Sequence, residues 1–133
     1  MSEANVETLR RIYEAWGRGE FAEGSELYDP HIVLVLRPEF PESGPHYGRD
    51  AIRKYMREDF LLDLDRPTIS GEEFLEAGDS VVVAVHQQGM GPRSGAPVDM
   101  RYFQLWTFRA GTVIRIECIM EREDALEAAG LTG

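Results

Sequence analysis

The chain has 133 residues, one cysteine, and 24 acidic against 14 basic side chains, which gives a formal net charge of -10. A charge this negative repels nucleic-acid phosphates and anionic lipid surfaces, so neither nucleic acid nor a membrane is an expected partner. We expect one domain over residues 1–133 with a substantial core, and a cytoplasmic location, because a lone cysteine allows no internal disulfide.

The chain shows no targeting or membrane-spanning pattern. Its first residues, MSEANVETLRR, contain acids and no apolar run, unlike a signal peptide. The longest aliphatic runs, residues 32–36 and 81–85, are too short to cross a bilayer and are typical of buried strands.

Two helices are predicted at the N-terminus. Apolar side chains recur three to four residues apart over residues 6–16, which predicts a helix that ends at Gly17 or Gly19. Residues 21–28 fit a short second helix that stops before Pro30, because proline disfavours helical conformation in the residue that precedes it.

A strand, a loop and a third helix follow. Residues 31–37 predict a strand, and the proline-rich residues 38–45 predict a loop of the kind that often borders a site. Asp50 is the expected N-cap of the third helix, which ends near Asp63. Its expected buried stripe consists of Ile52, Tyr55, Met56 and Phe60.

The second half of the chain predicts a run of strands and a final helix. The expected elements are strands at 68–75 and 80–88, a glycine-rich turn at 90–97, a long hairpin at 99–120, and a helix at 121–129 capped by Gly130. This order predicts an α+β fold in which helices group on one face of a curved antiparallel sheet.

The hairpin has two alternative registers. A three-residue loop at residues 109–111 places Tyr102 opposite Cys118. A two-residue loop places Gln104 opposite Glu117, because a one-residue slip exchanges the faces of one strand. The two registers therefore put different side chains, a thiol or a carboxylate, on the aromatic face.

Four segments, in this order, resemble the nuclear transport factor 2-like superfamily and within it the SnoaL-like branch. The segments are VETLRRIYEAWGRGEF, ELYDPHIVL, YGRDAIR, and WTFRAGTVIRIE followed by EDALEAAGL. The resemblance implies a cone-shaped barrel, a bent antiparallel sheet wrapped around the N-terminal helices with an apolar pocket between them. It also implies a homodimer formed through the outer sheet face. The superfamily includes ketosteroid isomerases, limonene epoxide hydrolases, polyketide cyclases and dehydratases, so the fold alone does not select a reaction.

The resemblance also implies which hairpin residues face the pocket. In hydrolase and cyclase relatives an acid lies seven residues after the hairpin glycine, and Cys118 holds that position here. Cys118 is expected to be a small buried hydrophobe; as a nucleophile it would need a nearby cation to lower the pKa of its thiol. The resemblance favours the three-residue loop, with the pocket lined by Met100, Tyr102, Gln104, Trp106, Ile114, Ile116, Cys118 and Met120.

His86 is the candidate acid or base. Alternation along its strand places Val82, Ala84, His86 and Gln88 on one face. If that face lines the pocket, His86 neighbours Tyr102 and can exchange a proton with a bound substrate. The alternative is a partly solvated histidine at a strand end with no role. Three scattered histidines with no close pair predict no metal site.

Other side chains are candidates for binding. Arg37 is expected at the cone mouth, where it either meets a substrate oxygen or remains a surface residue. The amide of Gln104, within an aromatic strand, needs a hydrogen-bond partner such as a ligand or water. Aromatic and sulfur side chains that line the pocket or fill the core are Tyr13, Trp16, Tyr28, Tyr55 and Met56.

Three functions are consistent with the sequence. One is an isomerase, cyclase, dehydratase or epoxide-opening enzyme for a small, apolar, neutral molecule, with His86 as acid or base and with Tyr102 and Gln104 orienting the substrate. Another is a ligand-binding protein without turnover, and the third is a protein-interaction module that uses the sheet face. No phosphate-binding loop, nucleophile elbow or zinc motif occurs in the chain, so no cofactor is expected.

Overall fold

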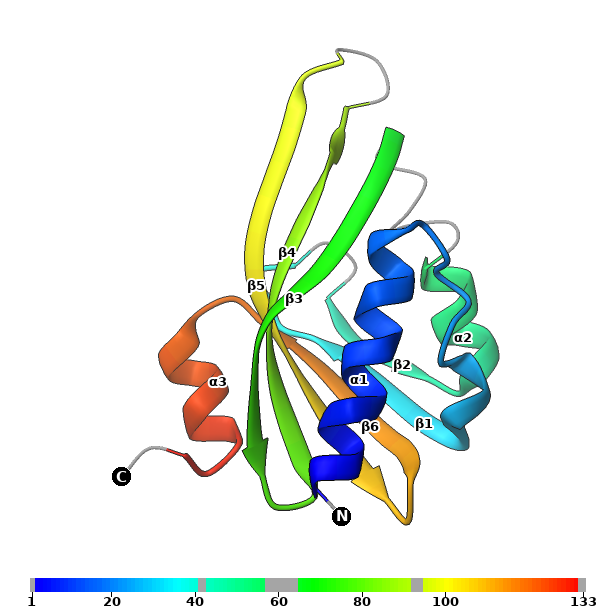
Figure 1. The fold of residues 1–133 in the computed structure, drawn as a ribbon, viewed down its shortest axis with the longest axis vertical. Coiled ribbons are helices and arrows are strands. Elements are labelled where there is room, and N and C mark those ends of the chain that lie inside the picture. Colours follow the sequence, from blue (N-terminus) through cyan, green and yellow to red (C-terminus); the bar gives the residue numbers. More distant parts are fainter. Residues whose placement is uncertain (1, 41–42, 57–64, 92–94, 132–133) are drawn as a thin grey trace.

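A computed structural model describes residues 2–40, 43–56, 65–91 and 95–131 (Figure 1). The elements are α1 (Ser2–Gly17), a 3-10 turn (Ser25–Leu27), β1 (Tyr28–Leu36), β2 (Gly44–Tyr47), α2 (Arg49–Lys54), β3 (Asp65–Ala77), β4 (Ser80–Met90), β5 (Pro97–Arg109), β6 (Thr112–Ile119) and α3 (Arg122–Ala128). Within the described ranges, no helix combines the length and apolar character needed to cross a bilayer.

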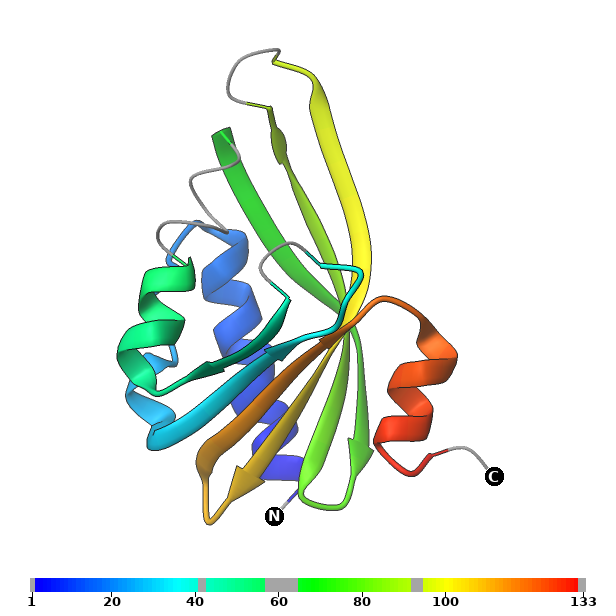
Figure 2. The ribbon, with the colours of Figure 1, turned by 180° about the vertical axis from the view of Figure 1, so that it is seen from behind.

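The strands form one six-stranded sheet in the order β2-β1-β6-β5-β4-β3. Neighbouring strands are antiparallel except for β1 and β6, which run parallel. Among the described residues no ladder joins the edge strands β2 and β3, so the sheet is bent but open (Figures 1 and 2). The α+β class is confirmed, whereas a closed and wholly antiparallel barrel is not what forms.

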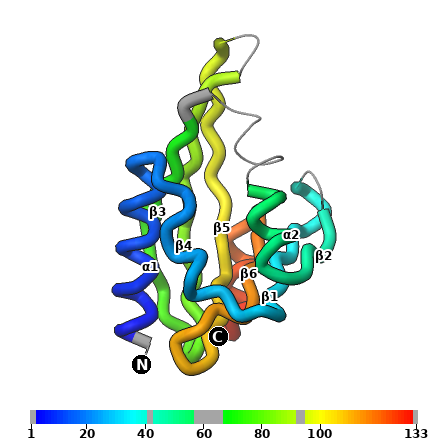
Figure 3. Tube along the Cα trace, turned by 90° about the vertical axis from the view of Figure 1, so that its right-hand side faces the viewer, coloured from blue at the N-terminus to red at the C-terminus, as the bar shows by residue number. Residues whose placement is uncertain are grey.

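Helices cover both faces of this sheet. Figure 3 shows α1 beside β3 and β4, and α2 beside β1 and β2, on the face that we call the inner face. On the opposite, outer face, Ala125 of α3 packs on Val82, Leu105 and Ile119. The expectation that all helices group on one face is therefore wrong, because these outward apolar side chains also need a cover.

The first helix follows its predicted apolar stripe. Leu9, Ile12, Tyr13 and Trp16 are all buried against the inner face. In Figures 1 and 2, α1 crosses the lower part of the sheet, and β3, β4 and β5 extend beyond both α1 and α2.

Residues 21–28 do not form the predicted second helix. Gly24 has a positive φ of 91°, which interrupts helical conformation, and only a 3-10 turn follows it. A Cβ atom at Gly24 would lie 2.6 Å from the Ile12 side chain, which would have to move, and the positive φ favours glycine in any case. The chain then enters β1 at Tyr28, two residues earlier than Pro30.

The next helix also starts differently from the prediction. Gly48, with a φ of 88°, occupies the N-cap position of α2, so Asp50 lies inside the first turn. Ile52 and Tyr55 are buried as expected. Phe60 and the predicted end of this helix lie outside the described residues.

The C-terminal elements agree well with the sequence. The predicted strands at 68–75 and 80–88 lie within β3 and β4, and the final helix is α3. Gly130 has a φ of 75°, and its N–H donates to the Glu127 carbonyl at 3.0 Å. The Leu131 N–H donates to the Leu126 carbonyl at 2.8 Å, which completes a glycine-closed helix end.

The β5–β6 hairpin combines features of both predicted registers. Its turn contains two residues, Ala110 and Gly111, with φ values of 51° and 81°. Such paired positive values belong to the tight turn that suits the twist of a hairpin. A bulge follows, because Phe108 pairs with Val113 whereas Thr107 pairs with Arg115.

The bulge puts the same β6 side chains, Ile116 and Cys118, on the inner face as the three-residue loop would, but it changes which β5 residues they lie opposite. Ile114 is the extra residue of β6, so Gln104 lies opposite Cys118 and Trp106 lies opposite Ile116. Gln104 does not face Glu117, and the predicted pairing of Tyr102 with Cys118 is wrong.

Candidate functional site

The inner face of the sheet holds most of the side chains that the sequence singled out. Cross-strand pairing and burial place one set on this wall: Val81, Val83, Val85 and Gln87 of β4, Met100, Tyr102, Gln104 and Trp106 of β5, and Val113, Ile116 and Cys118 of β6. Met120 packs at the border of the same core. Ile114, which was expected to face inward, is half-buried at the bulge, and Val113 faces inward in its place.

A chain of polar contacts crosses the wall beneath α1. Trp106 Nε1 donates to the Tyr13 hydroxyl at 3.0 Å, and this hydroxyl donates to Gln104 Oε1. Gln104 Nε2 in turn lies 3.5 Å from Cys118 Sγ. Both ends of the Gln104 amide are therefore engaged by the protein, and the partner expected from a ligand or water is Tyr13 instead.

The thiol of Cys118 is a packing group here. It is buried, and desolvation raises its pKa to about 12, opposed by the contact with Gln104. A thiol is nucleophilic only when ionised, so this position supports no covalent chemistry near neutral pH. Burial also raises the pKa of the Tyr13 hydroxyl well above its usual value.

A second polar pair lies nearer the free end of the β4–β5 hairpin. The Tyr102 hydroxyl donates to Gln87 Oε1 at 3.0 Å, and both residues are buried. The Phe40 ring meets the Tyr102 ring edge to face at 5.4 Å. Burial raises the pKa of the Tyr102 phenol well above its ordinary value, so Tyr102 is a neutral hydrogen-bond donor.

Gln87 was not selected from the sequence. The signal was present but ambiguous, because residues 81–85 read VVVAV, and either set of alternate positions could face inward. Pairing with β5 shows which set faces inward, since Val85 lies opposite Tyr102 and Gln87 lies opposite Met100.

His86 lies on the outer face, so its predicted position in the pocket is wrong. Its Nε2 is 2.8 Å from Asp99 Oδ1, and its Nδ1 is 3.6 Å from Glu72 Oε2. Arg101 completes the cluster with its Nε 3.2 Å from Glu72 Oε1. Gln88 shares this face and is exposed. Each ring nitrogen of His86 therefore faces a carboxylate, and the side chain points away from the inner wall.

Arg37 also lies on the outer face rather than at a cone mouth. Its Nε lies 2.8 Å from Glu117 Oε2, and Arg115 Nη2 lies 3.4 Å from Glu117 Oε1. Glu117 thus forms ion pairs on the outer face, and it is not a pocket acid.

The remaining aromatic candidates border the inner core at two ends. Trp16 packs on Trp106 with ring centroids 6.0 Å apart and donates from Nε1 to the Glu23 carbonyl at 3.3 Å. Tyr28 is buried at the start of β1, and desolvation raises its pKa to about 12. Directly after α2, the Tyr55 ring contacts the His46 ring in a tilted arrangement with centroids 5.3 Å apart, and Met56 is half-buried beside the core.

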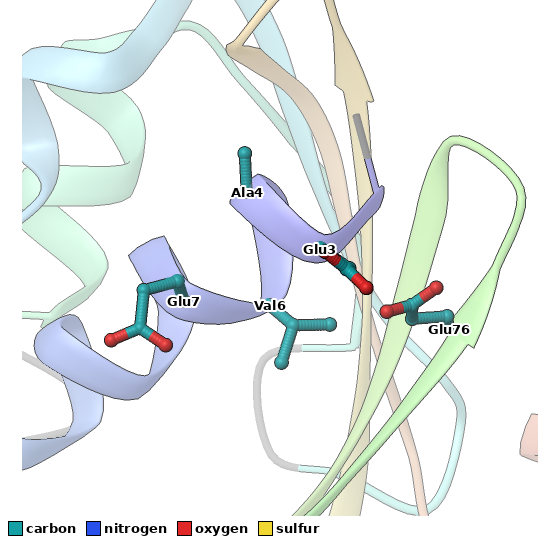
Figure 4. A pocket seen from close by; sticks show the side chains of 5 residues that line it. All are labelled: Glu3, Ala4, Val6, Glu7 and Glu76. Atoms are coloured by element: carbon teal, nitrogen blue, oxygen red, sulfur yellow. The ribbon is translucent and has the colours of Figure 1, made fainter.

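A separate depression of about 490 Å³ lies at the N-terminus of α1 (Figure 4). Its lining consists of Glu3, Ala4, Val6, Glu7 and Glu76. None of the side chains predicted to bind a ligand borders it, and its glutamates make it acidic.

Residues 9–116 match the family model of the SnoaL-like domain. The chain belongs to the SnoaL-like domain family. An uncharacterized protein of Mycobacterium tuberculosis (strain ATCC 25618 / H37Rv) is 24% identical over 114 residues, which span 86% of each chain.

Solved structures show the same fold for this SnoaL-like protein. An NTF2-like protein of unknown function from Burkholderia pseudomallei K96243 superposes with a TM-score of 0.74 at 18% identity, over 92% of this chain and 95% of that one. TerC, co-crystallized with polyporic acid, superposes with a TM-score of 0.69 at 20% identity, over 95% of this chain and 98% of TerC. The expected SnoaL-like family is confirmed by the family model, and the expected nuclear transport factor 2-like fold is confirmed by the solved structures.

Proposed function

We propose that this SnoaL-like protein binds a small, neutral, largely apolar molecule against the inner face of the sheet, beside Tyr102. One observation carries the proposal: the side chains of β4, β5 and β6 on this wall are apolar or uncharged. The ionic clusters around His86 and Glu117 lie on the outer face. A wall of this kind favours a ligand that is mostly apolar and has one or two polar groups. It disfavours a charged ligand, because the charge would lose its hydration and find no partner.

The fold supports the same assignment. TerC shares this fold and was co-crystallized with polyporic acid, which supports the proposal that the SnoaL-like chain also holds an organic ligand. For a reaction of isomerase or cyclase type, Tyr102 is the proposed donor to a substrate oxygen, with its hydroxyl hydrogen turned from Gln87 to the substrate. Binding without turnover is the simpler proposal, because Gln104 is engaged by Tyr13 and His86 faces away from the wall.

Retention of a ligand tests the proposal directly. Native mass spectrometry of the freshly purified protein should show a bound small molecule. Titration with the neutral fluorescent probe N-phenyl-1-naphthylamine should show saturable binding. Analogues of this probe that carry a carboxylate should bind at least tenfold more weakly than neutral analogues.

A matched pair of variants locates the site. Met100→Trp adds bulk to the inner wall and should abolish probe binding, whereas Gln88→Trp adds the same bulk on the exposed outer face and should preserve it. Both variants should keep the circular dichroism spectrum of the folded protein. Equal binding by the two variants would show that the probe does not occupy the inner face.

We also propose a cytoplasmic homodimer formed through the outer face of β1 and its neighbours. Val33 and Val35 are half-buried on this face beside the Arg115–Glu117 pair, which leaves apolar surface for a second copy. Val35→Lys should shift the mass measured by light scattering from dimer to monomer, and Glu127→Lys on exposed α3 should not. A monomeric wild-type protein would refute this assembly.

A further inference from the structure

We infer that Gln87, together with Tyr102, recognises a carbonyl oxygen of the ligand. The inference rests on the proposed function and adds to it a residue and a chemical class. The starting observation is that two glutamines lie on the inner wall and that their amides are used differently.

Both ends of the Gln104 amide are engaged by the protein. Its oxygen accepts from Tyr13, and its nitrogen contacts Cys118 Sγ. Gln87 differs, because only its oxygen is engaged, by the Tyr102 hydroxyl at 3.0 Å. Among the described residues, Gln87 Nε2 has no hydrogen-bond partner.

The free amide nitrogen borders space that solvent can reach. Every fully buried side-chain nitrogen or oxygen in the described part of the chain has a partner. Since Gln87 Nε2 has none there, it is not fully enclosed, although the residue as a whole is only 5% exposed. A nearly buried amide with unused donors is a costly arrangement in the absence of an acceptor from outside the protein.

The surroundings select the kind of acceptor. Met100 and Ile69 flank Gln87 across the two neighbouring strands, and the Phe40 ring packs on Tyr102. The nearest ionisable side chains, His86 next to Gln87 and Asp99 next to Met100, project from the other face and contact each other. The donor therefore faces apolar surroundings, which suit a neutral acceptor such as a ketone, quinone, ester or amide oxygen and not a carboxylate.

The inference holds for either orientation of the amide. If its oxygen and nitrogen are exchanged, Gln87 donates to the Tyr102 oxygen, and the Tyr102 hydroxyl hydrogen becomes the free donor. In both arrangements the pair retains a hydrogen to donate to a group that only accepts.

Two probes of matched shape test this recognition. 2-Acetonaphthone carries a carbonyl, and 2-ethylnaphthalene carries a methylene at the same position. Affinities are measured by displacement of N-phenyl-1-naphthylamine. Wild type should prefer the ketone about tenfold, the effect expected for one hydrogen bond to an otherwise unpaired buried donor.

Variants assign the preference to the pair. Gln87→Leu leaves the Tyr102 hydroxyl as a lone donor, so it should reduce the ketone-to-hydrocarbon ratio, and Gln87→Leu combined with Tyr102→Phe should bring the ratio close to one. Gln88→Leu, one residue away on the outer face, should keep the tenfold ratio. Gln87→Met and Tyr102→Phe, which keep side-chain length and ring packing respectively, serve if Gln87→Leu fails to fold, and each should reduce the ratio.

The outcomes separate this inference from the proposed function. If wild type binds both compounds equally, or if every folded Gln87 variant keeps the preference, the inference is overturned and the proposed function stands. If wild type binds neither compound nor the fluorescent probe, the proposed function fails and the inference fails with it.

Discussion

Replacing Tyr13 with phenylalanine tests whether the polar chain beneath α1 stabilises the fold. The substitution removes one oxygen but deprives two buried groups of their partner, Trp106 Nε1 and Gln104 Oε1. Each buried polar group left without a partner costs about 1–3 kcal/mol. Part of the combined cost of the two groups is offset, because the variant no longer buries the Tyr13 hydroxyl. We therefore expect Tyr13→Phe to lower the free energy of unfolding by about 2–4 kcal/mol.

The assay is urea unfolding followed by tryptophan fluorescence, with thermal unfolding as a second readout. For a chain of this length each kcal/mol corresponds to a decrease of about 4 °C in Tm, so a decrease of roughly 8–16 °C is expected. Tyr28→Phe is the matched control. Tyr28 is also buried, but its hydroxyl has no hydrogen-bond partner among the described residues, so its loss should change stability by less than about 0.5 kcal/mol.

A double-mutant cycle isolates the contact between α1 and β5. In a Gln104→Leu background the acceptor is already absent, so Tyr13→Phe should cost about 1 kcal/mol less than in wild type. The reasoning is refuted if Tyr13→Phe is no more destabilising than Tyr28→Phe, or if the two changes at Tyr13 and Gln104 are additive.

Three further predictions concern the core. The Cys118 thiol, buried and with its pKa raised to about 12, should react with Ellman's reagent only in denaturant, and rapid reaction of the native protein would contradict its burial. The pKa of Cys118 in the folded protein lies above its ordinary value of 9.0, so between these two values the folded state keeps a proton that the unfolded state releases. The contribution of this group to stability is therefore complete below pH 9 and is lost as the pH rises toward about 12. The loss is on the order of 1 kcal/mol per pH unit. Urea unfolding at pH 7, 9, 10 and 11 should show this decline and a shallower one in Cys118→Ala; identical profiles would count against it. At Gly71 an added Cβ would lie 2.6 Å from the Phe74 ring, so Gly71→Ala should destabilise by about 1–3 kcal/mol, whereas Gly17→Ala, whose nearest contact is at 3.8 Å, should be neutral.

The parts of the fold that were predicted correctly have local causes. The apolar stripe of α1 and the alternation along β5 are properties of a few neighbouring residues, so Trp16 and Trp106 could be placed in the core and Tyr102 and Gln104 on the inner wall. The final helix and its glycine closure depend on an equally short segment.

The parts that were predicted wrongly depend on which strands become neighbours. In β4 both sets of alternate positions are apolar, so the face of His86 was decided by the pairing of Val85 with Tyr102. Arg37 was expected at a pocket mouth, but the parallel pairing of β1 with β6 places it beside Glu117.

The sequence by itself determined the α+β class, the family, and the positions of most helices and strands, because helix stripes, strand alternation and glycine turns act over a few residues. Only the tertiary structure decided which polar side chains face the inner wall and which partners they find there. The bulge at Ile114 selected the partner of Gln104, and the contact from Tyr13, 91 residues away, satisfied its amide. The unused amide donor on Gln87 became visible only once the partners of the fully buried side-chain polar atoms in the described part of the chain were known. Hydrogen-bond satisfaction in a core depends on all the groups that meet there, and their meeting is a property of the folded chain.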